Sequence, residues 1–223
     1  MAEFYLVRHG QASFGTDDYD RLSMLGEQQS LWLGQYLAER KIEFDRIIIG
    51  TQLRHRQTAE GICRGMGRPA VFTEHAGLNE YDFYALYNAL GEEHAALKQL
   101  ASGNKHEFYK GLKEVLLLWS NDGLKGALPE KWEAFAQRIN DALQFIQQCD
   151  AQRILVVSSG GPIGMMTRQV LAAPANIALE LNFQVRNASL SHFYFNRRSV
   201  KLASFNNIAH LDQADRLHAI TYG

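Results

Sequence analysis

The sequence predicts an α/β protein in which a mostly parallel sheet lies between layers of helices. Three short runs, residues 4–7, 46–49 and 154–157, are rich in β-branched or aromatic side chains, and each precedes a small-residue turn and a helical pattern. The runs are continuously apolar instead of alternating, which is typical of strands covered on both faces. We therefore expect a three-layer sandwich in which strand and helix alternate along the chain.

Two apolar stripes between the first and the third of these strands predict helices that pack on the sheet. Ser23, immediately before the first stripe, is a residue type that caps helix N-termini. Each helix is expected to turn its stripe toward the sheet. The first stripe consists of Leu25, Trp32, Leu33, Tyr36 and Leu37, and the second of Ala59, Ile62, Cys63 and Met66.

The segment at about residues 81–128 departs from this alternation. It carries an apolar helical face and is interrupted by turns of small and polar residues, such as 102–104. We predict that it forms a helical cap insertion within a single domain spanning residues 1–223. The helical face consists of Phe108, Leu112, Val115, Leu116 and Trp119.

The last third of the chain predicts a long helix, the third strand and then a hairpin. Pro129 suits the first turn of a helix whose apolar face leads into the strand at 154–157. Residues 189–195 and 200–205 flank a polar turn, which predicts a hairpin and at least one antiparallel strand. The apolar face of the helix consists of Trp132, Phe135, Ile139, Leu143 and Ile146.

Composition excludes several classes of protein. The 223 residues include 23 basic and 24 acidic side chains, without the basic excess that nucleic-acid binding requires. The first apolar run stops at Arg8, far short of the roughly 20 residues that a membrane span needs. Cys63 and Cys149 have no C-x-x-C spacing, so we expect both to be buried thiols. Together these observations predict a cytoplasmic protein without nucleic-acid or membrane partners. The oligomeric state is not indicated.

Polar residues follow each of the three predicted strands. Arg8 and His9 follow the first, Arg54 lies in the first turns of the helix after the second, and Ser159 and Gly160 follow the third. Because the carboxyl ends of parallel strands meet at one sheet edge, we expect these groups to form one oxyanion pocket, where free N–H groups at a helix start also contribute. Arg56 is the alternative to Arg54.

These residue types suit phosphoryl transfer. A planar guanidinium can hold two phosphoryl oxygens at once, and a neutral imidazole such as that of His9 can accept a phosphoryl group covalently. The departing oxygen then needs a proton. Glu80, at the start of the predicted cap, is the natural general acid if burial raises its pKa, and Asp82 is the second choice.

The motifs together resemble the histidine phosphatase superfamily, also described as phosphoglycerate mutase-like. This resemblance implies that His9 accepts the phosphoryl group, that Arg8 and Arg54 clamp it, and that Glu80 donates the proton. Neither a metal nor an organic cofactor is expected, because the guanidinium groups supply the positive charge. The similar segments are Leu6-Val7-Arg8-His9-Gly10, Leu22-Ser23-Met24-Leu25-Gly26, Leu53-Arg54-His55-Arg56-Gln57-Thr58-Ala59, Leu78-Asn79-Glu80 and Val156-Val157-Ser158-Ser159-Gly160-Gly161.

One position departs from the family pattern. Ser159 stands where the family carries a second histidine, and the loss of one preorganised donor typically lowers a rate by about 10²–10³-fold. Compensation is expected either from the N–H groups of Gly160 and Gly161 or from another histidine, such as His192 or His210. The sequence does not choose between them, and it assigns Ser159 no aspartate or histidine partner as a nucleophile.

Hydrolysis of a phosphomonoester is the expected reaction, with a small phosphorylated substrate or a phosphoprotein as partner. Gly15 stands where glycolytic mutases carry an asparagine, so phosphoglycerate mutase-like phosphoryl transfer is the less favoured alternative. A catalytically weakened module that binds phosphate or phosphoprotein is the other alternative, and the serine at position 159 is the residue that favours it.

Overall fold

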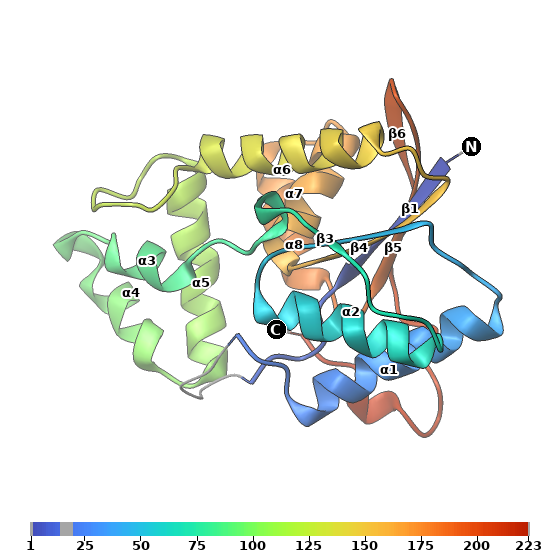
Figure 1. The fold of residues 1–223 in the computed structure, drawn as a ribbon. Helices are drawn as coiled ribbons and strands as arrows, with labels where there is room; N and C mark the ends of the chain where they lie inside the picture. The colour runs from blue at the N-terminus through green and yellow to red at the C-terminus, as the bar shows by residue number, and fades with distance from the viewer. Residues whose placement is uncertain (1, 14–19, 223) are drawn as a thin grey trace.

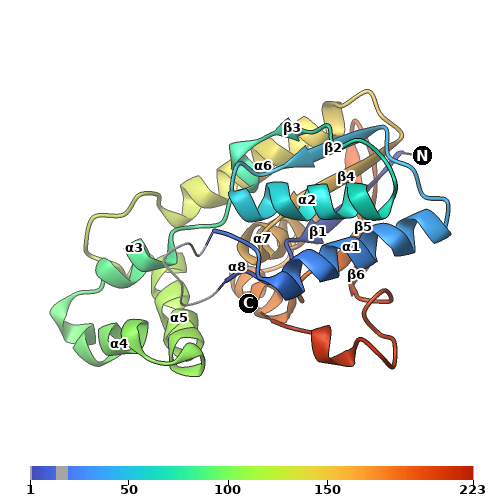
Figure 2. The same ribbon diagram turned by 60° about the horizontal axis from the view of Figure 1, so that its bottom comes forward.

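The computed structural model describes residues 2–13 and 20–222, which form a six-stranded sheet with helices on both faces (Figures 1 and 2). The strand order is β3-β2-β4-β1-β5-β6, so the two central strands, β4 and β1, are far apart along the chain. The strands are β1 (Ala2–Arg8), β2 (Arg46–Ile49), β3 (Thr73–Glu74), β4 (Arg153–Ser158), β5 (Leu190–Asn196) and β6 (Ser199–Asn207).

The mostly parallel sheet and the antiparallel hairpin are confirmed. β4 lies parallel to both β1 and β2, and β2 lies parallel to β3, whereas β5 runs antiparallel to β1 and to β6. The three apolar runs are the strands β1, β2 and β4, whose carboxyl ends meet at one edge. β3 was not predicted, because its two residues are too few to show a periodic pattern.

Alternating side chains of β1 point to two separate cores. Tyr5 and Val7 pack with α1 (Met24–Glu39) and α2 (Leu53–Gly65), as most residues of the two apolar stripes predict, although the described part of this core does not include Leu25 and Trp32. Phe4 and Leu6 belong to the larger core on the opposite face, which also contains apolar residues of α6 (Trp132–Gln148), α7 (Gly160–Val170) and α8 (Ala175–Gln184). Burial on both faces explains why the strands are continuously apolar.

The segment predicted to form a cap contains α3 (Phe83–Asn88), α4 (Ala95–Gln99) and α5 (Lys105–Ser120), which lie to one side of the sheet (Figure 1). Aromatic side chains of α3 and α5 pack against each other, and the Tyr87 hydroxyl donates a hydrogen bond to the Phe108 carbonyl at 2.6 Å. Four short 3-10 turns complete the described elements: η1 (Ala76–Leu78), η2 (Glu92–His94), η3 (Leu100–Ser102) and η4 (Leu217–Ala219).

Two helix starts test the local sequence rules. Ser23 caps α1 as predicted, since its hydroxyl accepts a hydrogen bond from the Gly26 N–H at 3.1 Å. The placement of Pro129 in the first turn of α6 is wrong, because this helix begins at Trp132. The residue after the proline is held by a tertiary contact instead, in which the Trp119 indole N–H donates to the Glu130 carbonyl at 3.2 Å.

Both cysteines are free thiols, with Cys63 buried in α2 and Cys149 half-buried just after α6. Within residues 2–13 and 20–222, no helix has the length and apolar character needed to cross a membrane.

Candidate active site

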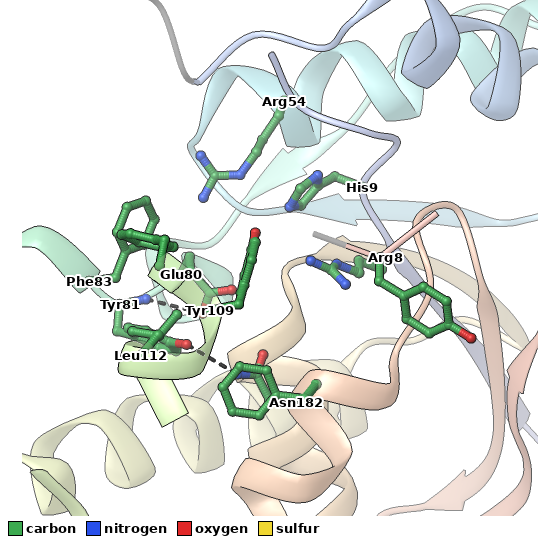
Figure 3. Close-up of a pocket in the computed structure, with 12 residues that line it drawn as sticks. Arg8, His9, Arg54, Glu80, Tyr81, Phe83, Tyr109, Leu112 and Asn182 are labelled. Carbon is green, nitrogen blue, oxygen red and sulfur yellow. Dashed lines mark hydrogen bonds between the residues drawn. The ribbon is translucent and has the colours of Figure 1, made fainter. Parts of the chain in front are cut away.

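The carboxyl edge of the sheet opens into a cavity that four of the predicted site residues line. Arg8 is the last residue of β1, His9 follows it, Arg54 lies in the first turn of α2, and Glu80 follows η1. Figure 3 shows that both guanidinium groups, the imidazole and the carboxyl group reach toward the same space. The topology therefore brings together residues from three separate segments.

His9 is held in a single orientation. Its ring is almost fully buried, and Nδ1 lies 2.7 Å from the Gly10 carbonyl. Because a carbonyl can only accept, Nδ1 carries the hydrogen and Nε2 keeps its lone pair. Burial, followed by the charges of Arg54 and Arg8, lowers the pKa of His9 well below its usual range, so the ring is neutral at pH 7.

The turn that carries His9 is tied to α2 by Thr58. The Gly10 N–H donates to the Thr58 hydroxyl at 3.0 Å, and that hydroxyl donates to the Arg54 carbonyl at 2.7 Å. One buried threonine thus sets the position of the imidazole relative to the arginine. This contact explains why the threonine lies four residues after Arg54, since one helical turn returns its side chain to that carbonyl.

Both guanidinium groups are fixed by further contacts. Arg54 is buried, and its Nη1 lies 2.7 Å from Asp20 Oδ1 while its Nη2 donates to Gln52 Oε1 at 2.9 Å. Arg8 is also buried and donates from Nη1 to the Val185 carbonyl. These contacts hold the two guanidinium groups in place where they line the cavity (Figure 3).

Glu80 reaches the first turn of α7 from the segment that follows η1. Its Oε2 accepts a hydrogen bond from the Gly161 N–H at 3.1 Å, and its own N–H donates to Gln52 Oε1 at 3.0 Å. Burial raises the pKa of Glu80, even though N–H groups of Gly161 and Tyr81 bond its carboxylate and the two arginines lie nearby. A Cβ at position 161 would lie 2.2 Å from Glu80 Oε1, so a larger residue there would displace the Glu80 carboxylate.

Ser159 and Gly160 lie at the same edge, where Ser159 precedes the first residue of α7. Ser159 is fully buried, and its hydroxyl lies 2.7 Å from Nε2 of His55. The alternative histidines lie elsewhere: His192 Nε2 lies 2.7 Å from Glu3 Oε2, and the His210 ring packs against Tyr36.

The two alternative site residues also have other partners. Arg56 is exposed and forms an ion pair with Glu74, so α2 turns this side chain away from the cavity. Asp82 caps the start of α3, where its carboxylate accepts from the Ala85 N–H at 2.9 Å. Gly15 lies outside the described residues.

Sequence reasoning missed Asp20, Gln52 and His55, each of which contacts a predicted site residue. Gln52 was within reach of local analysis, because it lies directly before the helix that carries Arg54. His55 belongs to the same motif, but its partner Ser159 is 104 residues away, and no local pattern identifies such a pair.

The rest of the cavity wall is mostly apolar. Its described residues come from the start of α3, from α5, from α8 and from the C-terminal segment, and their side chains are aromatic, aliphatic or amide. They are Tyr81, Phe83, Phe108, Tyr109, Leu112, Asn182, Phe183 and Tyr222. The cavity therefore has a cationic end at the sheet and an aromatic end beneath the helices of residues 83–120.

This arrangement suits a phosphoryl group bound next to a nucleophile. Two fixed cations can hold its oxygens, a neutral imidazole offers a lone pair, and a carboxyl group with a raised pKa can supply a proton. Within the described part of the chain, no group of three histidine, cysteine, aspartate or glutamate side chains could hold a metal ion.

Comparison with known proteins gives one family and several similar folds. The family model described as histidine phosphatase superfamily (branch 1) matches residues 4–208. The chain is 27% identical over 204 residues to a protein of Erwinia tasmaniensis named "Probable phosphoglycerate mutase GpmB", covering 86% of this chain and 84% of that protein.

Two solved structures show a similar fold. The alpha-ribazole phosphatase of Shigella flexneri matches with a TM-score of 0.65 and 22% identity, over 93% of this chain and 97% of that one. A mutant phosphoserine phosphatase of Entamoeba histolytica, in complex with phosphoserine, matches with a TM-score of 0.65 and 21% identity, over 95% of this chain and 100% of that one.

Proposed function

Because the chain belongs to the histidine phosphatase superfamily (branch 1), we propose that it hydrolyses phosphomonoesters through a phosphoryl group carried on Nε2 of His9. The observation that carries this proposal is the tautomer of His9. Its Nδ1–H donates to the Gly10 carbonyl, so the remaining lone pair belongs to a ring that lines the cavity with Arg8, Arg54 and Glu80.

In the first step, the Nε2 lone pair of His9 attacks phosphorus while the bond to the leaving oxygen breaks. Arg8 and Arg54 hold the phosphoryl oxygens and offset their negative charge. The protonated carboxyl group of Glu80 gives its proton to the leaving oxygen, which departs as an alcohol. The raised pKa of Glu80 supports this role, because it enlarges the protonated fraction near neutral pH.

In the second step, water attacks the phosphorus of the phosphohistidine and the phosphorus–nitrogen bond breaks. The electron pair of that bond returns to His9 Nε2, and the Glu80 carboxylate takes the proton that the water loses. Inorganic phosphate then leaves, and both side chains regain their starting protonation states.

The cavity wall supports a small substrate with a carbon-rich leaving group. The described cations of the cavity lie at the phosphoryl end, whereas Phe83, Phe108, Leu112 and Phe183 surround the space beyond it. An uncharged aryl or alkyl group removes this surface from water, whereas a carboxylate there would lose hydration without a cationic partner. We expect a higher kcat/KM for 1-naphthyl phosphate than for 3-phosphoglycerate.

Labelling tests the proposed intermediate directly. Wild-type protein mixed with a radiolabelled aryl phosphate and quenched in alkali should carry an acid-labile phosphoryl group at His9, and steady-state turnover should release inorganic phosphate. His9→Ala should abolish both, whereas His106→Ala, which alters an exposed histidine of α5, should change neither. A fully active His9→Ala protein would refute the proposal.

The same experiment separates the alternatives. A phosphate-binding module would bind inorganic phosphate without labelling or turnover, and a mutase would return the phosphoryl group to an organic acceptor. The free lone pair of His9 and the raised pKa of Glu80 favour hydrolysis over the binding module, because phosphate binding alone needs neither a nucleophile nor a proton donor.

A further inference from the structure

His55, Ser159 and His9 form a buried cluster at the carboxyl edge of the sheet. β1 and β4 pair in register with Arg8 opposite Ser158, and the His9 N–H donates to the Ser158 carbonyl at 2.9 Å. His9 follows Arg8 and Ser159 follows Ser158, so His9 and Ser159 are neighbours across the two strands. His55 reaches the cluster from α2, with its ring centroid 5.8 Å from that of His9 and its Nε2 2.7 Å from Ser159 Oγ.

We propose that His55 is a positioning residue that holds the Ser159 hydroxyl as a hydrogen-bond donor to the phosphoryl group transferred to His9. This inference rests on the proposed function and adds a second imidazole to the site. It also answers which histidine assists Ser159: neither His192 nor His210, but a side chain that follows the phosphate-binding Arg54 by one residue.

The burial of His55 decides which nitrogen carries its hydrogen. Burial and the neighbouring charge of Arg54 lower the pKa of His55 well below its usual range, so its ring is neutral. Among the described residues, Nδ1 has no hydrogen-bond partner, and it faces Gly50, where a Cβ would lie 2.1 Å away. A buried N–H without a partner is rarer in proteins than an unused acceptor, so Nδ1 is bare and Nε2 carries the hydrogen.

This tautomer orients the serine. When His55 Nε2–H donates to Ser159 Oγ, the hydroxyl oxygen is the acceptor and its own hydrogen is left to donate elsewhere. α7 begins beside the site: a Cβ on Gly160 would lie 3.6 Å from Arg8 Cζ, and the Gly161 N–H bonds Glu80. The serine hydrogen can therefore point to a phosphoryl oxygen held by Arg8.

Orientation before the reaction is the benefit of this contact. A free hydroxyl rotates among several directions, whereas one that is fixed by a buried imidazole need not reorganise as negative charge moves onto the phosphoryl oxygens. Because His55 is neutral, it supplies direction without adding a third positive charge next to Arg8 and Arg54.

A double-mutant cycle tests the coupling. With p-nitrophenyl phosphate as the substrate, Ser159→Ala should lower kcat by roughly 10²-fold, as loss of one preorganised donor does. His55→Leu keeps the side-chain volume similar but removes the donor, and it should lower kcat by a similar factor with a smaller change in KM. The double variant should be no slower than Ser159→Ala, since His55 acts through the serine.

Rescue and a control complete the cycle. His55→Gln restores an N–H donor to the serine and should recover most of the lost kcat, which a role in packing alone would not predict. His106→Ala is the matched histidine control and should keep full activity. Losses that multiply in the double variant, a fully active His55→Leu protein or a phosphoryl label recovered on Ser159 would each overturn the proposal.

Two measurements remain informative without turnover. The ¹⁵N spectrum of wild-type protein labelled at histidine should show His55 protonated at Nε2, and a hydrogen on Nδ1 would overturn the proposal. Calorimetry should show that Ser159→Ala and His55→Leu weaken vanadate binding together, and unchanged vanadate affinity would also overturn it. Absence of both turnover and label in the wild type would instead refute the proposed hydrolysis.

Discussion

Arg54 and Arg56 lie two residues apart on α2, yet the helix directs them to different environments. Arg54 is buried in the cavity wall between Asp20 and Gln52, and Arg56 is exposed beside Glu74. The residue type alone therefore does not define a phosphate ligand. Position on the helix and the carboxylates that approach each guanidinium group determine its role.

Substitution of these two arginines should give contrasting results. Arg54→Ala removes a fixed cation from the phosphoryl end, and we expect kcat/KM for p-nitrophenyl phosphate to fall by roughly 10²–10³-fold. Arg56→Ala breaks an exposed ion pair of a kind that contributes about 0–1 kcal/mol to stability, so its kcat/KM should match the wild type. Equal losses in the two variants would contradict the assignment of Arg54.

Glu80 should act according to the leaving group. Glu80→Gln cannot donate the proton, so the rate at which His9 is phosphorylated should fall by about 10²–10⁴-fold for an alkyl phosphate but far less for p-nitrophenyl phosphate, whose leaving group needs no proton. Burial raises the pKa of Glu80, so wild-type kcat for the alkyl ester should decrease as pH rises through that value. Glu80→Gln should remove this alkaline decrease, and a variant that keeps it would assign the proton to another group.

At the scale of elements, single side chains link the ends of strands to the starts of helices. Thr58 of α2 holds both the turn after β1 and the carbonyl of Arg54, while Glu80 after η1 accepts from the first turn of α7. These contacts connect elements that are distant along the chain. The relative positions of the site residues therefore depend on how α2 and α7 pack at the edge of the sheet.

A matched pair of threonines tests this dependence. Thr58→Val leaves the buried Gly10 N–H without its partner, which should cost about 1–3 kcal/mol of stability and also lower kcat by displacing His9. Thr167 in α7 is equally buried, but its hydroxyl has no partner among the described residues, so Thr167→Val should be neutral or stabilising. Urea unfolding and kcat measurements distinguish the two, and a similar cost at both positions would contradict the assigned role of Thr58.

At the scale of the whole molecule, burial of several neutral histidines links stability to pH. His9, His55 and His210 all have a lowered pKa, with burial as the largest cause in each case. The unfolded chain binds protons at these residues below a pH of about 6.5, whereas the folded chain does not. The free energy of unfolding should therefore decrease as pH falls below this value.

His210 lies away from the cavity and isolates this effect from catalysis. Burial and the charge of Arg216 lower its pKa to about 3, so the wild type should lose about 2 kcal/mol at this residue between pH 7.5 and pH 5. His210→Phe keeps a ring against Tyr36 and should lose about 2 kcal/mol less over that range. Urea unfolding at the two pH values measures the difference, and identical losses would mean that His210 titrates normally.

The sequence by itself determined the central strands, the helices α1, α2 and α6 beside them and five residues of the candidate site, since each lies in a local pattern. α8 was not predicted. Apolar runs identified β1, β2 and β4, and the polar residues that follow them identified Arg8, His9, Arg54 and Ser159. Glu80 was identified as a carboxylate at the start of the predicted cap, within the family-like motif Leu78-Asn79-Glu80. Periodicity and strand ends are local properties, so one chain suffices to show them.

Only the tertiary structure decided the contacts that orient these groups. The partnership of His55 with Ser159, the fixing of Arg54 by Asp20 and the aromatic wall provided by α3 and α5 all join segments far apart in sequence. Such contacts depend on which buried side chains meet after the helices pack on the sheet. Packing of this kind is a property of the whole chain, and hydrophobic spacing along one segment carries no information about it.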